Sequence, residues 1–155
     1  MLSTLRTFEV QFGFMKFYYL FATAFAMLFS LNLTAQSTLG YWASVDDETG
    51  QEKSQVLIYE QDGKQYGRIT RLIHAPNHLC DKCTDYRKNQ PILNMIVIEN
   101  MEAKDNYWQG GKVLYPRQGK WYDLKYWLKE DDPDTLVLRG SWGMFYRTQY
   151  WTRVK

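Results

Sequence analysis

From Leu39 onward the sequence is a succession of short runs in which apolar and polar residues alternate. This two-residue period is that of a half-buried β-strand, and clusters of Gly, Asp, Asn and Pro separate one run from the next. No segment carries the period of an amphipathic helix. The strand-like runs are Leu39–Val45, Ser54–Glu60, Lys64–Ile73, Ile92–Met101, Tyr107–Tyr115, Trp121–Lys129, Thr135–Ser141 and Met144–Arg153.

Short strands joined in order by tight turns predict an all-β chain of antiparallel hairpins. Asp62-Gly63 is one such turn, because Gly tolerates the positive φ that primed hairpin turns require. About eight strands in a chain of this length favour a small up-and-down barrel, which leaves no free sheet edge. A two-sheet sandwich is the alternative, since it is also built from short antiparallel strands.

Residues 1–35 have the organisation of a secretory signal peptide. Lys16 precedes an uncharged apolar run, 17–29, and the chain then becomes small and polar as far as Ala35. This order predicts export to the periplasm or the extracellular space, with cleavage near Ala35. A transmembrane anchor is the alternative reading, but no cluster of Lys or Arg follows the apolar run.

Met15 is a second candidate for the start of the chain, because Met-Lys is a usual opening of a signal peptide. Residues 1–14 would then be an upstream extension. After cleavage we expect a single β-barrel domain at 36–155, with no membrane span.

The charge balance and the aromatic content indicate the kind of partner. The formal net charge is only +2, which is not the footprint of a nucleic-acid-binding protein. All six tryptophans lie beyond the signal peptide, more than a small core needs. We therefore predict a monomeric protein without a cofactor that holds a lipid, a sugar or a flat metabolite in an aromatic-lined cup. The residues predicted to bind this ligand are Trp108, Trp121, Trp127, Tyr146 and Arg147.

The one long non-periodic stretch contains both cysteines, Cys80 and Cys83. In an exported chain a nearby pair is expected to form a disulfide. His74 and His78 precede the pair, so a metal site is a second interpretation, although the spacing is not that of a zinc finger. Thiol-redox catalysis is a third, although no helix is predicted to lower the pKa of the first cysteine.

A series of different short motifs runs along residues 40–153. They are Gly40-x-Trp42, Asp46-Asp47-x-Thr49-Gly50, Ser54-x-Val56-x-Ile58-Tyr59-Glu60, Asp62-Gly63-Lys64-x-Tyr66-Gly67-x-Ile69, the cysteine pair, Pro91-Ile92 with Met95, Gly110-Gly111-Lys112, Gly119-Lys120-x-Tyr122, Arg139-Gly140 and Arg147-Thr148-Gln149-x-Trp151-x-Arg153. With these motifs the chain resembles a secreted bacterial family, domain of unknown function 2147. Two positions depart from the family pattern: Asn94 stands where Gly is usual, and Tyr115 where Asp is usual.

The opening Gly40-x-Trp42 and a basic residue near the end also resemble the calycin barrels, the lipocalins and avidins. In those barrels an early Trp packs beneath an Arg or Lys of the last strand, which implies a closing pair of Trp42 with Arg153 or Arg147. The resemblance implies a lipocalin-like or avidin-like barrel. We predict a ligand-binding module in preference to an enzyme, with a thiol-redox or metal-binding protein that uses Cys80 and Cys83 as the alternative.

Overall fold

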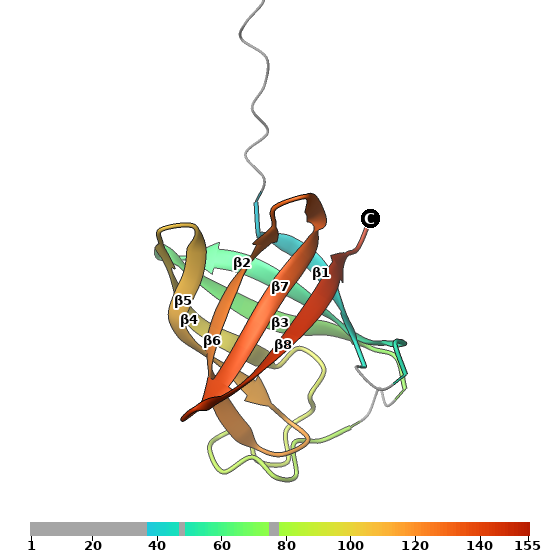
Figure 1. Ribbon diagram of the computed structural model, residues 1–155. Helices are drawn as coiled ribbons and strands as arrows, with labels where there is room; N and C mark the ends of the chain where they lie inside the picture. Colours follow the sequence, from blue (N-terminus) through green and yellow to red (C-terminus); the bar gives the residue numbers. More distant parts are fainter. Residues whose placement is uncertain (1–36, 47–48, 75–77) are drawn as a thin grey trace, which may run out of the picture. The chain divides into compact units, whose positions relative to one another are not determined.

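The strands form one closed antiparallel barrel in which each strand pairs with the next along the chain (Figure 1). The computed structural model describes residues 37–46, 49–74 and 78–155. Its strands are β1 (Gly40–Val45), β2 (Glu52–Gln61), β3 (Lys64–Leu72), β4 (Ile96–Lys104), β5 (Tyr107–Tyr115), β6 (Lys120–Lys129), β7 (Asp132–Trp142) and β8 (Phe145–Arg153). The described residues contain no helix that could cross a membrane. The predicted signal peptide and its cleavage point lie outside the described residues.

The first and last strands complete the barrel. Trp42 of β1 pairs with Arg153 of β8, and Ala43 pairs with Thr152. This pairing leaves neither strand with an open edge, which confirms the predicted barrel and excludes the sandwich.

The fourth strand begins later than the sequence predicts. The alternating run starts at Ile92, whereas β4 starts at Ile96. Between them the chain makes a turn in which Met95 N–H donates to the Ile92 carbonyl at 3.1 Å. Asn94 has φ +67°, so it adopts the left-handed conformation that the usual Gly would supply.

Gly67 marks a bend in the sheet, as its position within a strand run suggests. The β3–β4 register shifts on both sides of this residue. A Cβ at position 67 would lie 2.9 Å from the side chain of Ile98, so the two strands can approach this closely only at a glycine.

The barrel has one end sealed by side chains, which we call the closed end. There Tyr126 Oη and Thr38 Oγ1 donate to Gln65 Oε1 at 2.7 and 2.8 Å, and Trp42 Nε1 donates to the Thr38 carbonyl at 2.8 Å. Burial raises the pKa of the Tyr126 phenol, which therefore stays neutral. Trp42, Gln65 and Tyr126 are all buried, so this end offers no entrance.

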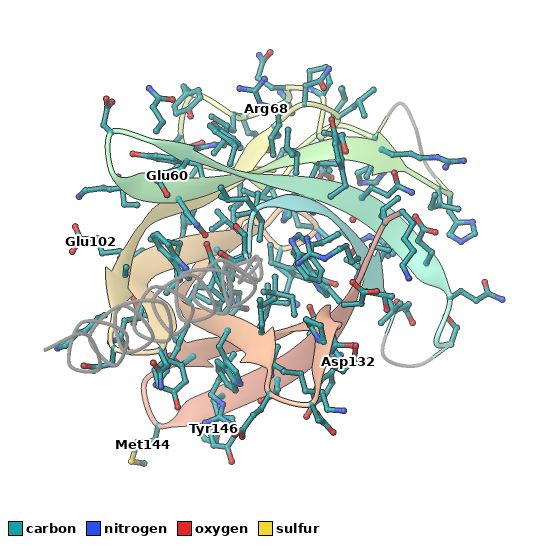
Figure 2. The ribbon with its side chains drawn as sticks, turned by 90° about the horizontal axis from the view of Figure 1, so that it is seen from above. Glu60, Arg68, Glu102, Asp132, Met144 and Tyr146 are labelled. Carbon is teal, nitrogen blue, oxygen red and sulfur yellow. A yellow bond between two sulfur atoms is a disulfide. The ribbon has the colours of Figure 1, made fainter. Side chains whose placement is uncertain are left out.

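The opposite end, which we call the open end, carries the turns β5–β6 and β7–β8 together with the segment between β3 and β4. We call the described part of that segment, residues 78–95, the cysteine insert. Figure 1 shows the cysteine insert at the lower end of the barrel and the C-terminus at the upper end. Seen from above, side chains fill much of the barrel interior (Figure 2).

Candidate ligand-binding site

A cavity lies toward the open end, between β5, β6, β7 and β8. Its volume is about 440 Å³, within the range of small-molecule sites. Leu124, Leu138 and Val113 give it apolar walls. The remaining lining residues are Tyr115, Gln118, Tyr122, Gly140, Trp142, Phe145, Tyr146, Arg147, Gln149 and Trp151.

A smaller cavity, of about 130 Å³, lies toward β1, β2, β3 and the cysteine insert. His78 and Ile92 of the insert line it, as do Pro116 and Arg117 of the β5–β6 turn. The two cavities share four lining residues, which are Val113, Tyr115, Gln149 and Trp151. They are therefore adjacent, and the insert forms part of the wall of the smaller one.

The charged groups around both cavities have one sign. Arg147 lines the large cavity, and Lys53 and Arg117 line the small one. Among the described residues, no Asp or Glu lines either cavity. A partly apolar cleft lined by cations and by no acidic residue favours an anion or an electron-rich group.

The indole of Trp151 adds an unsatisfied donor to this lining. Trp151 is only 6% exposed and lines both cavities. Its Nε1–H is buried, and no described residue accepts a hydrogen bond from it. Leaving such a donor unpaired costs about 1–3 kcal/mol, so an acceptor on a bound molecule would recover free energy here.

The donors of β8 follow the alternation of the strand. Arg147, Gln149 and Trp151 are two residues apart, so all three side chains face the barrel interior. Because Arg147 is nearest to the β7–β8 turn, the donors extend from the open end inward. Together with the apolar residues Val113, Leu124 and Leu138, these donors make the cavity amphipathic.

A buried cation, Arg87, holds the cysteine insert to the barrel strands. Arg87 is 4% exposed, and its guanidinium pairs with the carboxylates of Asp85 and of Glu99 on β4. The same guanidinium lies 4.9 Å from the ring centroid of Trp121 on β6 and 4.3 Å from that of Tyr86. Arg87 therefore fixes the insert to two strands at once.

Backbone contacts fix the insert to the β5–β6 turn as well. Gly119 has φ +66°, and a Cβ at this position would lie 1.9 Å from the Lys82 carbonyl oxygen. Cys80 and Cys83 form a disulfide, as predicted, and both residues are buried. No group of three or more metal-ligating side chains occurs in the described ranges, and buried sulfurs do not favour exchange with a protein thiol.

The structure places the five predicted ligand residues in two different environments. Arg147 and Tyr146 line the large cavity, whereas Trp108, Trp121 and Trp127 line neither cavity. Trp121 packs against Arg87, as described above. Trp127 packs edge-on against Tyr107, with ring centroids 5.3 Å apart, and lies 5.6 Å from the Arg139 guanidinium.

Sequence reasoning did not select Tyr115, Tyr122, Gln149 or Trp151. The alternation of the strand distinguishes these residues. Tyr122 is on the same face of β6 as the core residue Leu124, whereas Trp121 is on the other face. The same rule places Trp151 with Gln149 and Arg147. Choosing residues by aromatic chemistry alone ignored the direction in which each side chain points.

At the closed end the structure brings Trp42 and Arg153 together. The Arg153 guanidinium carbon lies 4.2 Å from the centroid of the Trp42 ring. Arg153 also donates to the backbone carbonyls of Ser37 and Leu39, at 2.7 and 3.0 Å. Arg147, the other residue considered for this pair, lines the large cavity instead.

Comparisons with known proteins agree with this architecture. A family model described as "Uncharacterized protein conserved in bacteria (DUF2147)" matches residues 40–153. No protein with a curated description matches the sequence. Among solved structures, the chain is similar to protein HP1028 from Helicobacter pylori, described as belonging to the lipocalin family, with a TM-score of 0.66 and 17% identity over 77% of this chain and 84% of that one. At this identity the likeness is one of fold.

Proposed function

We propose that this chain, which belongs to the DUF2147 family, is a binding module for an anionic amphipathic small molecule such as a fatty acid. The observation that carries the proposal is the lining of the cavities, in which every charged residue is basic among the described residues. Apolar side chains of β5, β6 and β7 would hold the hydrocarbon part. Arg147 would contact the anionic group from the side of the open end, and the Trp151 Nε1–H would contact it from the inner side.

The buried N–H of Trp151 favours a ligand that carries a hydrogen-bond acceptor. This N–H has no partner among the described residues, and Trp151 lies between the two cavities. A purely apolar molecule would leave this donor unpaired, whereas an amphiphile with a carboxylate or ester oxygen could accept from it. The lipocalin-like barrel is consistent with a small-ligand module, and the variants below test the named residues.

Dodecanoate is the probe for this function, and calorimetric titration of the purified protein is the measurement. We expect dodecanoate to bind more tightly than dodecanol, because the alcohol lacks the charge that Arg147 would meet. Arg147→Gln should raise the dissociation constant of dodecanoate about tenfold or more, because hydrogen bonds between charged groups are the stronger ones. Trp151→Phe, which removes a neutral donor, should raise it about two- to tenfold.

Trp127→Phe is the matched control, because Trp127 lines neither cavity. It should leave the dissociation constant unchanged. Equal binding of dodecanoate and dodecanol, or equal affinity of wild type and Arg147→Gln, would contradict the proposal.

We further propose that the protein is exported before it acts. The Cys80–Cys83 disulfide supports this, because such bonds persist in oxidising compartments and are rare in the cytosol. The expected result is an intact mass, measured on the protein in the periplasmic or secreted fraction, that corresponds to a chain starting near Gln36. Recovery of the protein in the cytoplasm with Met15 to Thr34 still attached would show that it is not exported.

A further inference from the structure

The turn of the β7–β8 hairpin carries a cluster of exposed apolar side chains that are not part of the hydrophobic core. We call residues 142–146 the aromatic tip. Trp142 pairs with Phe145 across the turn, and Gly143 has φ +59°, which suits a tight hairpin. Trp142, Met144, Phe145 and Tyr146 are 68%, 93%, 74% and 68% exposed. Figure 2 shows Met144 and Tyr146 projecting away from the barrel.

Such a cluster is unusual on a protein that meets only water. Four large apolar or aromatic side chains are exposed within five residues of the chain, and exposed apolar clusters mark interaction sites. Trp and Tyr are the residues that favour the boundary between water and lipid, where the ring is apolar and one polar atom stays wet. Phe145 is the only phenylalanine after residue 29, and it lies at this tip.

The surroundings of the aromatic tip are basic. Lys120 Nζ lies 5.8 Å from the Trp142 ring centroid, and the Arg139 guanidinium lies 4.8 Å from that of Tyr146. Arg147 follows the tip on β8, whereas Lys125 Nζ lies 3.3 Å from the ring centroid of Tyr107, the first residue of β5, and so points away from the tip. The acidic residues of strands β5 to β8 are Asp123, which pairs with Ser141 next to the tip, and Asp132 and Asp134, which lie at the closed end. Cations therefore outnumber acids around the tip.

We propose that the aromatic tip docks the barrel onto a lipid bilayer with anionic headgroups. The rings would enter the headgroup region, and the flanking cations would meet the lipid phosphates. A second copy of the chain is a poorer occupant, because tip-to-tip pairing would bring the cations of the two copies together. Trp142, Phe145 and Tyr146 also line the large cavity, so docking would set that cavity at the lipid surface. The proposal does not depend on what the cavity binds.

The test is flotation of the purified protein with vesicles. One set contains phosphatidylcholine and phosphatidylglycerol in equal parts, and the other contains phosphatidylcholine alone. Wild type should float with the anionic set and less with the neutral set, and added salt should release it. Met144→Glu should lower the partition coefficient about tenfold, and Lys120→Gln about fivefold.

Tyr41→Glu is the control, because Tyr41 is an exposed aromatic residue at the closed end, away from the tip. It should bind vesicles like wild type, and a thermal melt of each variant checks that it is folded. Met144 lines neither cavity, so its replacement leaves dodecanoate binding intact. The proposal is overturned if wild type binds neither set, if Met144→Glu floats as well as wild type, or if the tip residues only drive self-association.

Discussion

Replacing Trp42 by alanine is expected to lower the free energy of unfolding by about 3–5 kcal/mol, the usual cost of deleting a large buried aromatic side chain. Trp42 is fully buried at the point where β1 meets β8, and its Nε1–H donates to the Thr38 carbonyl at 2.8 Å. The substitution also removes the cation–π contact with Arg153, worth about 1–2 kcal/mol when desolvated. Urea denaturation measures the loss.

Tyr41→Ala is the matched control for this result. Tyr41 is the preceding residue of β1, but its side chain faces outward and is half exposed. Its replacement should cost less than about 1 kcal/mol, as surface substitutions do. Equal effects of Trp42→Ala and Tyr41→Ala would mean that the Trp42 contacts do not close the barrel.

Replacing Arg87 by methionine is expected to lower the free energy of unfolding by about 2–4 kcal/mol and to loosen the cysteine insert. The Arg87 guanidinium is buried between Asp85, Glu99 and the Trp121 ring, and removing it leaves two carboxylates without their cation. Their partial exposure keeps the cost below that of a fully buried pair. Hydrogen exchange measures the loosening through amides that hold the insert, such as Cys80 N–H, which donates to the Gln90 carbonyl at 2.9 Å.

Arg71→Met is the control, because Arg71 is an exposed arginine of β3. It should change neither the free energy of unfolding nor the exchange of the insert. If Arg87→Met behaves in the same way, then Arg87 does not hold the insert.

The Asp85–Arg87 pair also makes the insert sensitive to acid. Burial opposes ionisation of Asp85, but hydrogen bonds from Arg87 and its positive charge outweigh this and hold the pKa of Asp85 below its usual value. Because the folded pKa is lowered, the pair stabilises the fold above the unfolded pKa of about 4, and this stability is lost as the pH falls through the folded value. The protection factors of the insert amides, which compare the observed with the intrinsic exchange rate, should therefore fall below about pH 4 in wild type, and Arg87→Met should lack this fall.

The sequence pattern predicts the barrel well because the alternation that identifies each strand lies within that strand. The alternation of Tyr122, Leu124 and Tyr126 with outward-facing residues is visible without any knowledge of neighbouring strands. Turns such as Asp62-Gly63, with φ of +53° and +73°, follow from local conformational preference alone. Barrel closure follows because hairpins joined in order must otherwise leave two edges unpaired.

Features that depend on distant partners were not predictable in the same way. Arg87 lies in a non-periodic segment, and nothing in its neighbourhood indicates that Glu99 and Trp121 will bury it. The start of β4 was misplaced because Ile92 continues an apolar run while Asn94 makes a turn. The unpaired indole of Trp151 emerges only when all strands are in place, since it is defined by the absence of an acceptor among the described residues.

The indole region of a ¹H–¹⁵N spectrum tests the central claim most directly. Each of the six tryptophans contributes one Nε1–H resonance, and Trp151→Phe and Trp42→Phe assign the two that matter. On titration with dodecanoate, the Trp151 resonance should shift downfield as its N–H gains an acceptor. The Trp42 resonance should stay in place, because that N–H already donates to Thr38 at the closed end. A Trp151 resonance that does not move at saturating dodecanoate would contradict the account.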